Sequence, residues 1–117
     1  MTLSKNSKGF TLVEIMIVVV IIGLLATIAI PNLMRARTQS RTNLCINNLR
    51  IIAAAKDQAA IELSLTETVA PTTAQLSPYF KNVQLMDGLP KEPEGGTYTI
   101  GAISTDPTCS VGGAHSL

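Results

Sequence analysis

Residues 8–31 read KGFTLVEIMIVVVIIGLLATIAIP, and this stretch decides the fold of the N-terminal part of the chain. From Phe10 to Ile30 almost every residue is aliphatic. As a helix with a rise of 1.5 Å per residue, this segment is about 31 Å long, which matches a hydrocarbon core of roughly 30 Å. The β-branched run at residues 18–22 suits a strand, but a lone strand in lipid leaves its backbone groups unpaired. We therefore predict a transmembrane helix.

An ordinary secretory signal peptide is the first alternative, because Lys5 and Lys8 precede the apolar stretch. The stretch is longer than the usual apolar region of about 7–15 residues in a signal peptide. No pair of small residues with cleavage-site spacing follows it. These features favour an anchor that stays in the mature protein.

Glu14 is the one charged residue between Phe10 and Met34. An acid costs roughly 2.5–3.5 kcal/mol at the centre of a bilayer and less near its interface. One interpretation is a carboxylate that reaches the headgroups, helped by the positive end of the helix macrodipole. The other is a functional charge with a cationic partner, which must come from another chain or from a newly made N-terminus.

The segment from Lys8 to Glu14, followed by the aliphatic run and Pro31, resembles the N-terminal signature of type IV pilins and type II secretion pseudopilins. The resemblance implies that residues 1–9 are a leader, which a prepilin peptidase removes by cutting between Gly9 and Phe10. It also implies N-methylation of the new Phe10 amine. Glu14 would then neutralise the Phe10 amine of a neighbouring subunit during assembly.

Proline at position 31 removes one helical hydrogen bond, so we expect a kink there and not the end of the helix. Residues 10–31 form the transmembrane and assembly segment, and residues 32–65 are predicted to form an amphipathic helix. Lys56 is the single break in its apolar stripe. The stripe consists of Cys45, Ile46, Leu49, Ile52, Ala53, Ala59, Ala60 and Leu63.

Residues 66–117 are predicted to form a small head, too short to build a strong core alone. Thr72 or Thr73 can cap a short helical turn that continues towards Tyr79. Residues 94–96 are a turn signal, residues 97–100 alternate as a strand does, and a second strand is expected at 108–111. The predicted fold class is α+β and pilin-like: a long kinked helix with a small head that carries a short β-hairpin.

The head also contains shorter segments that resemble pseudopilins. Similar chains often carry Cys-Pro just before the Gly-Gly turn, whereas Glu92 and Pro93 stand there in this chain. The expected short-range partner of Cys109 is therefore missing. The matching segments are residues 47–50 and 55–57 in the predicted helix and residues 76–79, 95–98 and 109–115 in the head.

The two cysteines, Cys45 and Cys109, leave two interpretations open. If the head lies outside the cytoplasm, they can form a disulfide that ties the C-terminal tail to the helix. Alternatively they are separate thiols, with Cys45 acting as a small apolar residue of the stripe.

No constellation for catalysis or metal binding appears in the sequence. His115 is the only histidine, and no Cys/His cluster with zinc spacing surrounds it, so we expect a surface or packed residue and no metal. Asp106 and Glu94 suggest a calcium loop as in the major pseudopilins, but acids are few here. We expect neither an enzyme nor a cofactor.

A net charge of +1 gives no reason to expect nucleic acid as a partner. Arginines follow the apolar segment, and their phosphate-binding interpretation, as in DNA uptake, is weak because no aromatic residues are interleaved with them. Solvated positions or ion pairs between subunits, with acids such as Asp57 and Glu62, explain them better. The four residues are Arg35, Arg37, Arg41 and Arg50.

The expected function is structural: a pseudopilin subunit of a type II secretion or type IV pilus-like filament. The implied partners are identical subunits, the prepilin peptidase, an inner-membrane assembly platform and, before assembly, membrane lipid. The alternatives are a major or minor type IV pilin for adhesion, motility or DNA uptake, and a single-pass anchored binding module that never polymerises. Charge on both sides of the span does not orient it. The resemblance implies a single pass through the inner membrane with an extracytoplasmic head.

Overall fold

A computed structural model describes residues 8–117, so most of the predicted leader lies outside the described residues. The chain divides into two compact units, one ending at Arg37 and the other running from Thr38 to Leu117. A single long helix, α1 (Leu12–Leu63), contributes residues to both units. The other elements belong to the second unit. They are α2 (Thr73–Leu76), the 3-10 turn η1 (Ser77–Tyr79) and the strands β1 (Leu85–Met86), β2 (Leu89–Pro90), β3 (Tyr98–Thr99) and β4 (Thr108–Cys109).

The first unit is an apolar helix with no core of its own. Between Phe10 and Met34 every residue except Ala26 is exposed. The segment is long and apolar enough to cross a membrane by length and composition. The described residues of this unit therefore leave a long apolar surface unburied.

Helix α1 continues through Pro31, as expected. Its end differs from the predicted Leu65 by two residues. Ser64 takes the left-handed conformation with φ of 52°, and the Leu65 amide donates to the Ala60 carbonyl at 3.1 Å. This is the hydrogen bond of a Schellman motif, which closes a helix at the residue before the left-handed one.

The part of α1 in the second unit buries one face. Cys45, Leu49, Ile52 and Ala59 lie on this face, as the apolar stripe in the sequence predicted. The prediction for Lys56 is wrong, because Lys56 does not interrupt the buried face but belongs to it. Its ammonium donates to the backbone carbonyls of Ile100, at 2.8 Å, and Thr105. The buried face also ends earlier than predicted, because Leu63 is exposed.

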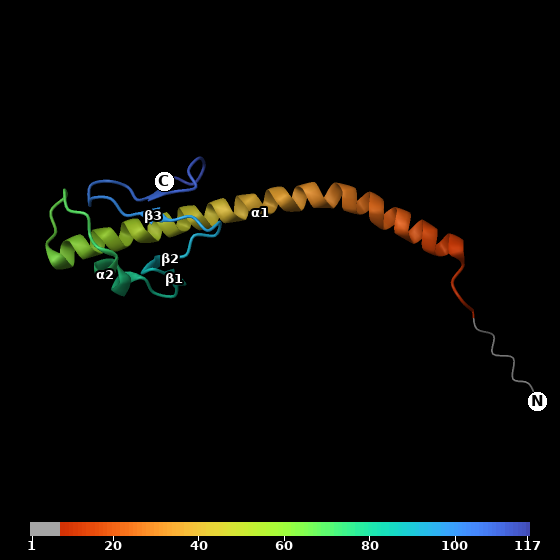
Figure 1. The fold of residues 1–117 in the computed structure, drawn as a ribbon, viewed down its shortest axis with the longest axis horizontal. Helices are drawn as coiled ribbons and strands as arrows, with labels where there is room; N and C mark the ends of the chain where they lie inside the picture. The colour runs from red at the N-terminus through yellow and green to blue at the C-terminus, as the bar shows by residue number, and fades with distance from the viewer. Residues whose placement is uncertain (1–7) are drawn as a thin grey trace, which may run out of the picture. The chain divides into compact units, whose positions relative to one another are not determined.

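The head runs beside this part of α1, as Figure 1 shows for α2 and the strands. Thr72 caps α2 in a capping box with Gln75, which confirms the predicted capped turn. β3 pairs antiparallel with β4 through Tyr98–Cys109 and Thr99–Thr108. The predicted α+β architecture with a short hairpin is confirmed, although each strand has only two residues.

A second hairpin, β1–β2, was not predicted. Leu85 pairs with Pro90 and Met86 with Leu89. The turn between them is Asp87-Gly88, with φ of 54° and 85°. Two consecutive positive φ values are the geometry in which Asp-Gly closes a two-residue hairpin.

The core of the second unit is one cluster formed by the buried face of α1 and the head. Head residues from α2, the loop after η1, β3 and β4 close over the helix. Its members are Cys45, Leu49, Ile52, Ala55, Ala59, Leu76, Phe80, Tyr98 and Cys109.

Candidate functional site

The predicted cleavage point precedes α1 on exposed chain. Gly9 and Phe10 lie outside any helix or strand, and Phe10 is 86% exposed. A Cβ placed on Gly9 would meet no atom within 4 Å. The described fold therefore gives no steric reason for glycine at this position.

Glu14 has a partner that the sequence analysis did not foresee. Its Oε2 accepts from the Thr11 backbone amide, and the Thr11 hydroxyl accepts from the Glu14 amide, both at 3.2 Å. This reciprocal pair is a capping box, which satisfies two orphan donors at the start of α1. A backbone amide is not a cation, so the predicted charge pairing with a Phe10 amine stays a prediction. The kink at Pro31 also stays a prediction.

The arginines after the apolar segment are exposed, in agreement with solvated positions. Among residues 8–117, the charge pairs within 4.0 Å both involve His115, so the arginines form no ion pair with a described acid. Of the acids proposed for them, Glu62 accepts instead from the Tyr79 hydroxyl. Their pairing with acids of other subunits stays a prediction.

The two cysteines lie next to each other although they are far apart in sequence. Cys45 lies on the buried face of α1 and Cys109 ends β4, and both are buried free thiols. Burial is the main cause that raises the pKa of Cys45 to about 12, followed by its hydrogen bond with Cys109, while a hydrogen bond with Tyr98 lowers it. In this state Cys45 is a protonated thiol at neutral pH and not a reactive thiolate. The two interpretations of the cysteines, a disulfide or separate thiols, both stay predictions.

Glu92 and His115 join the cysteines. The candidate ligand atoms of Cys45, Glu92, Cys109 and His115 all lie within 4.8 Å of one another. The His115 side chain is packed, because the residue is only 7% exposed. This agrees with one of the two predicted alternatives, a surface or a packed residue. Sequence spacing could not reveal this group because its members come from the helix, two loops and the end of a strand. Glu92 was missed altogether, since a lone Glu before a Gly-Gly turn carries no signal of burial.

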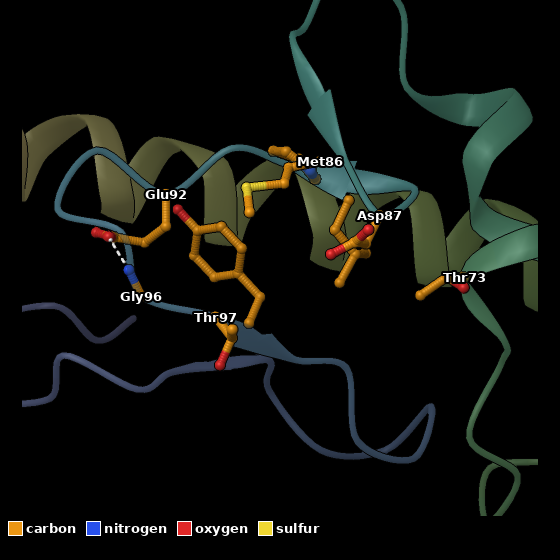
Figure 2. Close-up of a pocket in the computed structure, with 9 residues that line it drawn as sticks. Thr73, Met86, Asp87, Glu92, Gly96 and Thr97 are labelled. Carbon is orange, nitrogen blue, oxygen red and sulfur yellow. Dashed lines mark hydrogen bonds between the residues drawn. The ribbon is translucent and has the colours of Figure 1, made fainter.

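A shallow cavity of about 230 Å³ lies beside Glu92. Figure 2 shows Met86 and Asp87 from the β1–β2 hairpin on one side and Glu92, with its carboxylate turned towards the Gly96 nitrogen, on the other. Glu92 Oε2 already accepts from Glu94 N at 2.6 Å and Gly96 N at 2.7 Å. Among the described residues, Asp87 and Glu92 are the carboxylates that line it.

The acids considered for calcium are not brought into one site. Glu94 Oε2 lies 4.0 Å from His115 Nε2. Asp106 instead raises the pKa of Lys56 through its charge, against the larger lowering by burial. Neither acid belongs to the one group of three or more candidate metal ligands among residues 8–117.

Comparison with known proteins adds independent information. Residues 4–30 match the family model of the prokaryotic N-terminal methylation motif. Type II secretion system core protein G of Escherichia coli K12 is 30% identical over 111 residues, which cover 86% of this chain and 75% of that protein. Type IV wide pilus major component PilA4 of Thermus thermophilus is 32% identical over 112 residues, covering 96% of this chain and 76% of that protein.

A fimbrial protein of Pseudomonas aeruginosa is 34% identical over 85 residues. The match covers 72% of this chain but only 55% of the fimbrial protein, so the likeness spans about half of that relative. No solved structure matches the chain significantly.

Proposed function

We propose that this chain is a structural subunit of a pilus-like filament and not an enzyme. The proposal follows from its family, because the chain belongs to the type IV pilins and type II secretion pseudopilins. The single observation that carries this proposal is the exposed apolar surface of α1 between Phe10 and Met34. Lipid covers that surface before assembly, and the same segments of neighbouring subunits cover it in the filament.

Processing is proposed to begin with cleavage between Gly9 and Phe10 by a prepilin peptidase, followed by methylation of the Phe10 amine. The match of residues 4–30 to the methylation motif supports this step. The exposed position of Gly9 and Phe10, ahead of the first helical turn, supports access by a peptidase. The head would lie on the extracytoplasmic side of the inner membrane, and a membrane-embedded assembly platform would extract the subunit.

Glu14 is proposed to pair with the Phe10 amine of a neighbouring subunit. Among the described residues, its carboxylate accepts one hydrogen bond, at Oε2 from the Thr11 amide. A carboxylate has further lone pairs on both oxygens, so a second, cationic partner can bind while the cap is kept. Cleavage creates such a cation one residue before Thr11, at a depth where an unpaired acid is costly.

A secretion pseudopilin is our preferred subtype, because the head is short and its segments resemble that group. A type IV pilin is the second candidate, and the likeness to the Thermus pilus component over 96% of this chain supports it.

The test separates the charge of Glu14 from its capping role. Glu14→Gln keeps an acceptor for the Thr11 amide but removes the charge, because Gln also serves in capping boxes. Thr11→Val removes the hydroxyl of the cap but leaves the charge. We expect both variants to be cleaved before Phe10, as measured by the mass of the mature N-terminus. Filament yield after shearing should fall at least about tenfold for Glu14→Gln, a change that corresponds to about 1.4 kcal/mol. The yield should stay near wild type for Thr11→Val.

Wild-type filament yield from Glu14→Gln would refute the charge pairing. An equal loss from Thr11→Val would assign the effect to the helix cap. A mature N-terminus other than Phe10 in the wild type would refute the proposed processing.

A further inference from the structure

Three side chains from separate segments of the head converge on Cys45 of α1. Cys45 comes from the helix, Glu92 from the loop after β2, Cys109 from the end of β4 and His115 from the C-terminal tail. We propose that these residues form a binding site for one transition-metal ion, with Zn²⁺ as the preferred ion. The inference concerns the second unit alone and does not depend on the filament role.

The spacing of the donor atoms suits a tetrahedral ion. Zinc bonds of about 2.0–2.3 Å in a tetrahedron place ligand atoms roughly 3.3–3.8 Å apart. The four donor atoms here lie within 4.8 Å of one another. Closing this gap requires movements of about 1 Å, which side-chain rotation supplies.

Two polar atoms of the group make no hydrogen bond to any residue between 8 and 117. They are Glu92 Oε1 and His115 Nδ1, and both are buried. They lie 4.0 Å apart, too far to bond each other well. Buried polar atoms are nearly always satisfied, so an orphaned pair requires an explanation. A cation between them and the two sulfur atoms satisfies both.

The remaining atoms of Glu92 and His115 are held as the outer partners of metal ligands usually are. Glu92 Oε2 accepts two backbone hydrogen bonds, which leaves Oε1 turned away from them and available. On the other side, Thr42 Oγ1 donates to the Thr38 carbonyl at 3.0 Å and lies 3.2 Å from His115 Nε2. Since the Thr42 proton is already used, its oxygen accepts from Nε2–H. This tautomer leaves the lone pair on Nδ1, the orphaned atom.

The donor set selects the ion. Two sulfur ligands and an imidazole favour zinc over calcium or magnesium, which prefer oxygen ligands. Binding releases the protons of both thiols to solvent, so that two thiolates, one carboxylate and a neutral imidazole surround the ion with a net charge of −1. Four protein ligands in a buried place make a structural site with no open position for catalysis. The ion would join the tail and the Glu92 loop to the helix.

A disulfide between Cys45 and Cys109 competes with this site, because paired sulfur atoms are not thiolate ligands. The disulfide uses only the cysteines and leaves the orphaned atoms of Glu92 and His115 unexplained. The metal uses all four residues, and for this reason we commit to it.

The experiment uses the full mature chain, purified in detergent without chelators. One portion is kept native, and a second portion is denatured and its free thiols are alkylated. Native mass spectrometry is expected to find one zinc ion per chain, and the alkylated portion two free thiols. After removal of zinc under reducing conditions, Co²⁺ should give thiolate-to-cobalt charge-transfer absorption and the visible bands of a tetrahedral ion. Zinc should displace the cobalt and raise the midpoint of thermal unfolding.

Variants test the ligands that a simple dithiol site would not need. His115→Ala and Glu92→Gln should each lower zinc affinity by at least about tenfold, and Thr42→Val by about tenfold through its outer contact. Glu67→Gln is the matched control, because the Glu67 side chain is exposed and lies outside the four-residue group, so zinc affinity should be unchanged. A disulfide in the isolated chain would overturn the proposal. So would a reduced chain that binds no zinc, or zinc binding that is unaffected by both His115→Ala and Glu92→Gln.

Discussion

Lys56 illustrates how a single residue can reverse the meaning of a sequence pattern. Its methylene chain crosses the buried face of α1, and its ammonium reaches the carbonyls of Ile100 and Thr105 in the loop between β3 and β4. Long basic side chains can cover apolar surface in this way while the charged end finds polar partners. A lysine in an apolar stripe therefore fastens a loop to the helix here.

We predict that Lys56→Met lowers the free energy of unfolding by about 1–3 kcal/mol near neutral pH, because it leaves two carbonyls without their donor. Lys81→Met, at an exposed position, is the matched control and should change stability little. Urea unfolding of the mature chain in detergent measures both. A Lys56→Met variant as stable as wild type would show that water replaces the ammonium at no cost.

The pH dependence of the same residue gives a second measurement in this experiment. Burial lowers the pKa of Lys56 from its ordinary 10.5, although Asp106 and Asp57 act in the opposite direction. When the pH lies between the folded and the unfolded pKa of Lys56, the unfolded chain binds more protons than the folded chain. The Lys56 contribution to the free energy of unfolding therefore rises with pH in the window below 10.5. This rise should be absent in Lys56→Met. An identical pH profile for the variant and the wild type would contradict it.

Among the elements, the β1–β2 hairpin depends most on local turn chemistry. The hairpin also carries a hydrogen bond from Lys91 N to Gln84 O at 2.9 Å, just beyond its strands. Leu85 and Met86 are exposed, so packing of β1 contributes little and the turn must fix the register. Gly88 has φ of 85°, and a Cβ there would lie 3.4 Å from the Thr73 Cβ.

We predict that Gly88→Ala destabilises this hairpin by about 1–2 kcal/mol, because left-handed backbone is unfavourable for residues with a Cβ. Hydrogen exchange of the Lys91 amide should become faster by about tenfold or more, since 1.4 kcal/mol corresponds to a factor of ten. Asp87→Gly is the control, because it relieves the same constraint at φ of 54° and should not speed exchange. Equal exchange rates in Gly88→Ala and wild type would show that the turn does not limit the hairpin.

At the scale of the whole molecule, the two units have opposite relations to water. The core cluster lies entirely in residues 45–109, within the second unit. The long apolar run of exposed side chains lies in the first unit, between Phe10 and Met34. The hydrophobic effect therefore stabilises the second unit by its own folding and the first only through partners.

We predict that a fragment of residues 38–117 folds as a soluble monomer, whereas the mature chain from Phe10 needs detergent or assembly to stay in solution. Circular dichroism should show helix and a cooperative melt for the fragment, and size-exclusion chromatography should give a monomer. A fragment that aggregates or melts without cooperativity would show that the first unit contributes to the fold of the head.

The sequence by itself determined the properties that depend on neighbours along the chain. The apolar run at 10–30, the capped turn at Thr72 and the strands around Tyr98 and Cys109 follow from hydrophobic length, local hydrogen bonding and alternation, all of which act over a few residues. The Asp87-Gly88 turn belongs to this class too, because Asp-Gly between two short strands is a local turn signal.

Only the tertiary structure decided which distant side chains meet. Lys56 became a buried donor because loop carbonyls lie above it, and no pattern on the helix contains that information. Cys45, Glu92, Cys109 and His115 form one group because the two cysteines, the loop and the tail are brought to one point of α1. Such convergence depends on loop paths and packing across dozens of residues, whereas local preferences extend over only a few. The apolar segment at residues 10–30, which contains Glu14, could be recognised from the sequence alone, because it forms a single helix.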